Sequence, residues 1–76
     1  MVKEKVMDFI NEHGRASFKD LSDNIDSAKV FIAEALFKLK QEKLIYNKYE
    51  VHENSIVLIN FPYDSSKKTK EEEKAD

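Results

Sequence analysis

The side chains that could carry catalysis or hold a metal are few and far apart in this sequence. It has no cysteine and only two histidines, His13 and His52, and neither has a carboxylate at a motif spacing. No glycine-rich phosphate loop is present, because the chain contains a single glycine. The glutamates at 71–73 fall in a polar segment that cannot fix a reactive geometry. We therefore expect no catalytic residue, no metal site and no cofactor, and a protein that is not an enzyme.

Residues 26–45 have instead the pattern of a helix that makes contacts. Asp26 and Ser27 are good N-cap residues, and no glycine or proline follows them before Pro62. At about 100° per residue, one side gathers an apolar stripe that should face the core. The stripe comprises Ala28, Ile32, Ala35, Leu36 and Leu39. Polar residues then predict that the helix ends near Lys43.

The opposite side of this helix is more apolar than a solvated face should be. It carries Val30, Ala33, Glu34, Phe37 and Gln41, with Phe31 near its edge. One interpretation is that a flanking strand or the C-terminal tail covers these residues. The other is an exposed contact for a protein partner or a dimer mate.

Length and charge limit the classes of function. At 76 residues the chain forms one small domain, and its net charge of −2 argues against a general polyanion binder. Binding to DNA is not excluded, because charge can be segregated on one face. The absence of cysteine, of a signal peptide and of a membrane-length apolar run predicts a soluble, cytoplasmic protein with no membrane partner.

The remaining elements flank this helix. A first helix is predicted over 2–13, and Gly14 should end it in a left-handed conformation. At most a very short strand follows at 15–17. Ser17 and Asp20 resemble a capping box for a short helix over about 18–24. Two β-rich runs, 44–51 and 55–61, predict an antiparallel hairpin around a turn at 52–54, in which Asn54 is able to take a left-handed conformation.

The C-terminal segment differs in composition from the rest of the chain. Residues 64–76 read DSSKKTKEEEKAD, and their only apolar residue is Ala75. Such a segment buries too little apolar surface to offset the entropy of ordering. We expect a folded domain over 1–63 and a disordered, charged, solubilising tail over 64–76.

The order helix, short strand, helix, tight turn, longer helix and hairpin resembles the winged helix-turn-helix family. Its most specific part is ALFKLKQEKLI at 35–45, which looks like the end of a recognition helix that leads into a wing. The resemblance implies an α+β fold with three helices and a small antiparallel β-hairpin wing. The resemblance says little about function, since this fold hosts repressors, nucleic-acid readers and protein-binding modules alike.

The resemblance implies that double-stranded DNA would meet the helix at about 27–43 in the major groove, with the wing on the backbone or minor groove. The candidate contacts are Lys19, Ser27, Lys29, Lys38, Gln41 and Lys48. A branch of the family that binds left-handed DNA uses polar and aromatic residues on this helix, and the comparable positions here are Lys29, Ala33 and Phe37. The leading hypothesis is a small, non-catalytic, DNA-binding or transcription-related protein.

The alternative is a protein-protein interaction module that uses the apolar face of the long helix. Its candidate contacts are Val30, Phe31, Ala33, Glu34 and Phe37. A narrower likeness points the same way, because KEKVMDFIN at 3–11 and SFKDLSD at 17–23 resemble the start of accessory protein D of dissimilatory sulfite reductase. That likeness implies an accessory or regulatory factor of an enzyme complex.

Overall fold

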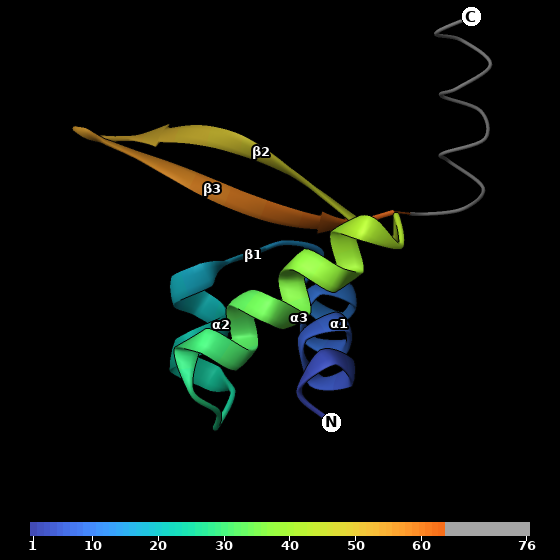
Figure 1. The fold of residues 1–76 in the computed structure, drawn as a ribbon. Coiled ribbons are helices and arrows are strands. Elements are labelled where there is room, and N and C mark those ends of the chain that lie inside the picture. Colours follow the sequence, from blue (N-terminus) through green and yellow to red (C-terminus); the bar gives the residue numbers. More distant parts are fainter. Residues whose placement is uncertain (64–76) are drawn as a thin grey trace, which may run out of the picture.

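The computed structural model describes residues 1–63, which form three helices and a three-stranded sheet. The elements are α1 (Val2–His13), β1 (Ala16–Ser17), α2 (Phe18–Asn24), α3 (Lys29–Gln41), β2 (Ile45–His52) and β3 (Ser55–Pro62). The three helices gather on one side, and the β2–β3 hairpin projects away from them (Figure 1). The predicted α+β arrangement is confirmed. The tail predicted for 64–76 lies outside the described residues.

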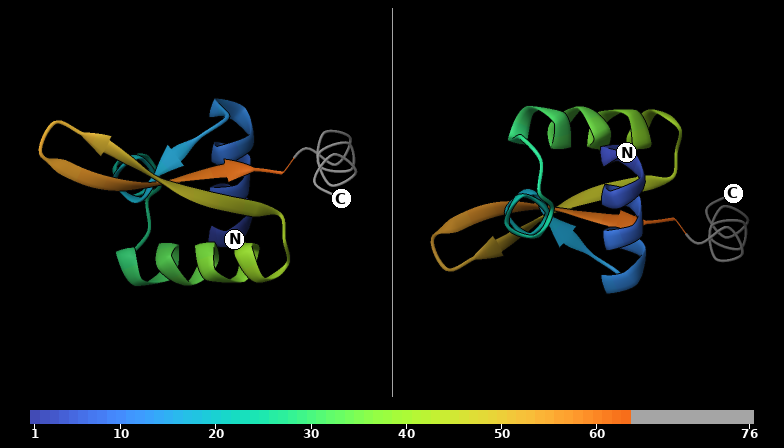
Figure 2. Two further views of the ribbon diagram at one scale, coloured as in Figure 1. Left: turned by 90° about the horizontal axis from the view of Figure 1, so that it is seen from above. Right: turned by 90° about the horizontal axis from the view of Figure 1, so that it is seen from below.

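The sheet is antiparallel, with strand order β1-β3-β2. β1 pairs with β3 only at Ala16 and Ser17, opposite Asn60 and Ile59. The buried Asn60 side chain also donates from Nδ2 to the Ala16 carbonyl oxygen at 3.0 Å. Beyond this short pairing the hairpin continues alone, and its tip extends past α2 and α3 (Figure 2).

The core lies where the three helices meet the base of the sheet. Its buried members are Val6, Ile10, Ala16, Leu21, Ile25, Ile32, Ala35, Leu39 and Ile45. From the predicted stripe of the long helix, Ile32, Ala35 and Leu39 are buried and Leu36 is half-buried. Ala28 is exposed, because it lies just before the first residue of α3.

Two helix boundaries follow from local sequence. Gly14 ends α1 with φ 79°, and its N–H donates to the Ile10 carbonyl at 2.8 Å. At the start of α2, the Asp20 N–H donates to Ser17 Oγ and the Ser17 N–H donates to Asp20 Oδ2, both at 3.0 Å. The predicted left-handed glycine and the predicted capping box are both confirmed.

Both ends of α3 differ from the prediction. The N-cap is Ala28, which supplies no side-chain hydrogen bond, whereas Asp26 or Ser27 was expected. The last turn closes with Leu44 N donating to the Leu39 carbonyl and Lys43 N donating to the Lys40 carbonyl, both at 3.0 Å. This is a Schellman motif, and it places Lys43 in the left-handed region with φ 61°. The helix therefore ends at Gln41.

The tip of the wing is a two-residue turn, Glu53-Asn54, between His52 and Ser55. The residue with positive φ is Glu53, at 56°, and not Asn54, which the sequence indicated as able to adopt this conformation. Two-residue hairpin turns whose twist suits the paired strands need a positive φ at the first turn residue. The strand register therefore decides the conformation at Glu53, against its local preference.

Candidate nucleic-acid interface on helix α3

The outward side of α3 is exposed in the folded domain. Val30, Phe31 and Phe37 have 68%, 55% and 62% of their surface accessible, and Ala33 and Glu34 are exposed as well. No strand among residues 1–63 covers these side chains. The structure therefore presents an apolar surface on the element that the fold places outermost.

A groove lies between α3 and the wing. It is lined by Phe18, Ala33, Leu36, Phe37, Lys40, Asn47, Leu58 and Asn60. Its walls are mainly apolar, while Lys40 adds a cation and Asn47 an amide. In the described part of the chain Lys40 makes no ion pair. We call this the wing-side groove.

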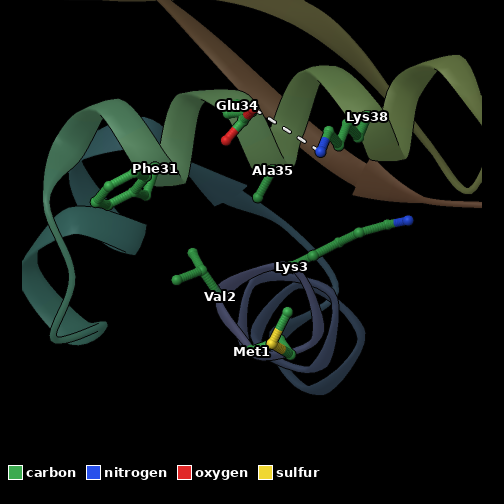
Figure 3. A pocket seen from close by; sticks show the side chains of 7 residues that line it. All are labelled: Met1, Val2, Lys3, Phe31, Glu34, Ala35 and Lys38. Atoms are coloured by element: carbon green, nitrogen blue, oxygen red, sulfur yellow. Dashed lines mark ion pairs between the residues drawn. The ribbon is translucent and has the colours of Figure 1, made fainter.

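A second hollow lies on the other flank of α3, against the start of α1 (Figure 3). It is lined by Met1, Val2, Lys3, Phe31, Glu34, Ala35 and Lys38. Its charges are already paired: Lys38 Nζ lies 3.8 Å from Glu34 Oε2, and Lys3 Nζ lies 2.5 Å from Glu42 Oε2. We call this the α1-side hollow.

The lysines of α3 are thus divided between two flanks. Lys38 lines the α1-side hollow and Lys40 lines the wing-side groove. Lys29 lies four residues before Ala33 and eleven before Lys40, a spacing that puts it on the wing-side flank. Lys40 was missing from the predicted contacts. Its spacing of three from Phe37 and seven from Ala33 is the signal that would have found it.

The structure does not bring the other candidate contacts into the wing-side groove. Lys48 follows Asn47 along β2, and successive side chains of a strand point to opposite faces, so Lys48 points away from the groove. Its ammonium lies 5.9 Å from the centre of the Tyr46 ring. Ser27 is half-buried before α3, and Gln41 is exposed at the last residue of α3.

Lys19 lies in a separate hollow beside β3, with Arg15, Asp20 and His52 among the lining residues. It makes an ion pair with Asp23, Nζ to Oδ2, at 2.6 Å. The hydrogen bond and the charge of Asp23 raise the pKa of Lys19, so it stays a cation whose charge is largely compensated. This position is less suited to phosphate binding than a free lysine.

On the face of the wing turned away from the groove, the carboxylate of Glu50 is paired with neighbouring basic side chains. Glu50 Oε1 accepts from Arg15 Nη2 at 2.5 Å and lies 2.9 Å from His52 Nε2. The hydrogen bonds from Arg15 and then His52 hold the pKa of Glu50 below its ordinary value. Arg15 also lies 5.5 Å from the Phe61 ring centre, and Phe61 stacks on Tyr46 with 5.3 Å between ring centroids.

Within residues 1–63 no three His, Cys, Asp or Glu side chains are grouped so that they could hold a metal ion. In that same part of the chain, no helix is long and apolar enough to cross a membrane. The absence of an enzymatic activity remains a prediction.

Two solved structures resemble this fold across most of its length. Stf76 from the Sulfolobus islandicus plasmid-virus pSSVx has a TM-score of 0.76 at 12% identity, over 92% of this chain and 94% of that one. The Zalpha domain of PKZ, in a crystal structure in complex with ds(CG)6, has a TM-score of 0.63 at 20% identity, over 79% of this chain and 92% of that one. The fold is a winged helix.

No protein-family model and no curated protein matches the sequence. Neither structural neighbour is an accessory protein of sulfite reductase, so that narrower likeness gains no support. At these identities the likeness establishes the fold of the winged helix alone.

Proposed function

We propose that the chain binds double-stranded nucleic acid through the wing-side groove of α3, as a small non-catalytic protein with a transcription-related role. The observation that carries the proposal is an exposed aromatic ring, Phe37, beside a lysine that has no ion pair within the described residues, Lys40. The winged-helix neighbour whose structure contains ds(CG)6 adds support for this class of ligand.

The groups in the groove and beside it on α3 have distinct roles in the proposal. Lys29 and Lys40 bind phosphates, because an ammonium without a carboxylate partner gives up no existing contact. Phe37 packs on the sugar or on a base edge, and Asn47 donates or accepts a hydrogen bond from the wing. Gln41 extends the polar surface at the last residue of α3.

The proposed binding depends on few charges and is therefore weak at physiological salt. If Lys29 and Lys40 neutralise two phosphates, the logarithm of the affinity should fall against the logarithm of salt with a slope of about −2. Glu34 does not oppose this strongly, since its carboxylate lies 3.8 Å from Lys38 on the other flank.

The test compares three charge reversals on one helix. Lys29→Glu and Lys40→Glu should each lower the affinity for a fluorescently labelled duplex about tenfold at low salt, as read by anisotropy. Lys38→Glu is the matched control, because it changes the net charge equally but lies in the α1-side hollow. We expect it to cost less than about threefold.

Two results would overturn the proposal. One is an absence of amide shifts in α3 when duplex is added at low salt. The other is an equal loss in Lys38→Glu and Lys40→Glu, which would show a response to net charge and not to the groove.

The outward apolar face favours a second candidate function, a protein-protein contact. Val30 and Phe37 are each more than half exposed, with Phe31, Ala33 and Glu34 beside them. An aromatic anchor ringed by mixed charge suits the centre of an interface. In this reading the chain is an accessory or regulatory factor of an enzyme complex, with dissimilatory sulfite reductase as one example, or it pairs with itself through α3.

Val30→Lys separates the two candidates. An added cation on α3 should raise duplex affinity about threefold if nucleic acid binds there. The same change should abolish an apolar protein contact, because the new ammonium loses its water. Phe37→Glu should weaken both while leaving the far-UV circular dichroism unchanged. Unfolding by that change would show that Phe37 supports the core and would remove the main argument for the protein contact.

A further inference from the structure

The outer edge of β2 is unpaired among the described residues. Strand order β1-β3-β2 places β2 at the end of the sheet, and the hairpin projects away from the helices (Figures 1 and 2). An exposed strand edge presents free backbone N–H and C=O groups, which form a template for another strand. Charged side chains often block such edges, so the placement of charge along β2 decides what the edge accepts.

The ladder with β3 fixes which residues of β2 face this edge. Tyr63 N donates to the Leu44 carbonyl oxygen at 3.1 Å, and Ile45 lies opposite Pro62, which has no N–H. Bonding in an antiparallel pair alternates from residue to residue. The backbone groups of Asn47 and Tyr49 therefore point to the free edge, as do those of Val51.

Because only every second residue of β2 points its backbone groups to the free edge, only some registers allow a second copy of β2 to pair with it in the antiparallel direction. The twofold axis must pass through a residue and its own copy. An axis through Lys48 sets two lysines face to face, and an axis through Glu50 sets two glutamates face to face, which destabilises both arrangements. An axis through Tyr49 sets Lys48 opposite Glu50 of the second copy, twice.

We propose that a second copy of this chain pairs with the free edge of β2, antiparallel and centred on Tyr49, so that two three-stranded sheets join into one. Two Lys48–Glu50 pairs favour this register over those centred on Lys48 or Glu50, and the exposed Tyr49 rings meet at its centre. The interface is isologous and closes after two copies.

Glu50 can serve both contacts at once. Arg15 and His52 both approach its Oε1 atom, which leaves Oε2 for Lys48 of the second copy. The contact is small beside a standard interface, so the dimer should form at micromolar and not nanomolar concentrations. The proposed contact does not involve α3, so its test is independent of the test for nucleic-acid binding.

The test is sedimentation equilibrium of the full chain without nucleic acid, from about 5 to 500 µM, a range suited to a micromolar dissociation constant. Lys48→Glu or Glu50→Lys alone should raise the dimer dissociation constant at least about tenfold. The double variant restores opposite charges across the twofold axis and should return to within about threefold of the original chain.

A backbone variant tests the edge itself. Tyr49→Pro removes an N–H that points to the free edge, whereas no bond to β3 is lost, so it should give a monomer at every concentration. Tyr49→Thr keeps the N–H and serves as the matched control that still dimerises. A chain that is monomeric throughout the range would overturn the proposal. So would a dimer that is unaffected by the single charge reversals, since a different surface would then hold it.

Discussion

The helical body and the distal wing treat apolar side chains in opposite ways. In the body, Ile10 and Ile32 are completely buried. On the wing, Val51 and Ile56 lie opposite each other in the β2–β3 ladder and are both more than 70% exposed. β-branched residues favour strands in both settings, but only the body gains stability from removing them from water. The exposed apolar side chains of the wing therefore add little to the stability of the fold and are free to contact a binding partner.

The difference arises from where the third strand stops. β1 pairs with β3 only opposite Ile59 and Asn60, so residues 55–58 pair with β2 alone. A two-stranded hairpin is marginally stable by itself in water. We therefore expect the wing tip to open locally at a lower free energy than the body unfolds.

The largest expected effect contrasts one apolar truncation in each region. Leu39→Ala should lower the free energy of unfolding by about 2–5 kcal/mol, because it removes buried methyl groups and leaves a cavity. Val51→Ala should change it by less than about 0.5 kcal/mol. Urea denaturation followed by circular dichroism measures both.

Equal losses in the free energy of unfolding from Leu39→Ala and Val51→Ala would contradict the distinction between body and wing. If Leu39→Ala does not fold, Ile32→Val offers a milder probe of the same core, with an expected cost of about 0.5–1.5 kcal/mol.

The parts of the fold that sequence predicted are those fixed by local chemistry. Gly14 and the Ser17–Asp20 capping box set their helix boundaries within a few residues of chain. The spacing of Ile32 and Leu39 fixed which side of α3 is buried. These signals need no knowledge of distant parts of the chain.

The parts that sequence missed depend on distant contacts. Helical spacing alone places Lys38 and Lys40 on different sides of α3, but only the positions of α1 and the wing show that Lys38 lines the α1-side hollow and Lys40 the wing-side groove. Similarly, Glu53 is left-handed because strand register demands it. The sequence therefore predicted the element that carries the candidate site, while the wing-side groove that we propose as the binding surface was not predicted.

A smaller change in stability is expected from the Ser17–Asp20 capping box, which lies where the helical body meets the sheet. Ser17→Ala removes the oxygen that accepts the Asp20 N–H and should cost about 1 kcal/mol. Its reciprocal partner adds a pH dependence. The Ser17 backbone N–H, which donates to the Asp20 carboxylate, lowers the pKa of Asp20 from its ordinary value.

The sign of this pH dependence follows from the lowered pKa. Stability from the Asp20 carboxylate is complete above the unfolded pKa of about 4 and is lost as pH falls through the lower, folded pKa. Asp20→Asn should therefore destabilise at pH 7 and converge on the original chain only as pH falls below the lowered pKa of folded Asp20. Urea midpoints across pH 2–7 measure the effect. A constant difference across that range would contradict the assigned role of the carboxylate.

The smallest expected effect uses the two left-handed residues, one in each region. Lys43 closes α3 with φ 61° and Glu53 forms the wing tip with φ 56°. Glycine adopts this conformation without steric cost, so each substitution should relieve about 0.5 kcal/mol of net local strain. Relief at Lys43 acts on the cooperative body, so Lys43→Gly should raise the urea midpoint. Relief at Glu53 should raise hydrogen-exchange protection of the wing amides and leave the urea midpoint unchanged, because the tip opens before the body unfolds. A matching rise in the urea midpoint from Glu53→Gly would show that the wing and the body unfold as one unit.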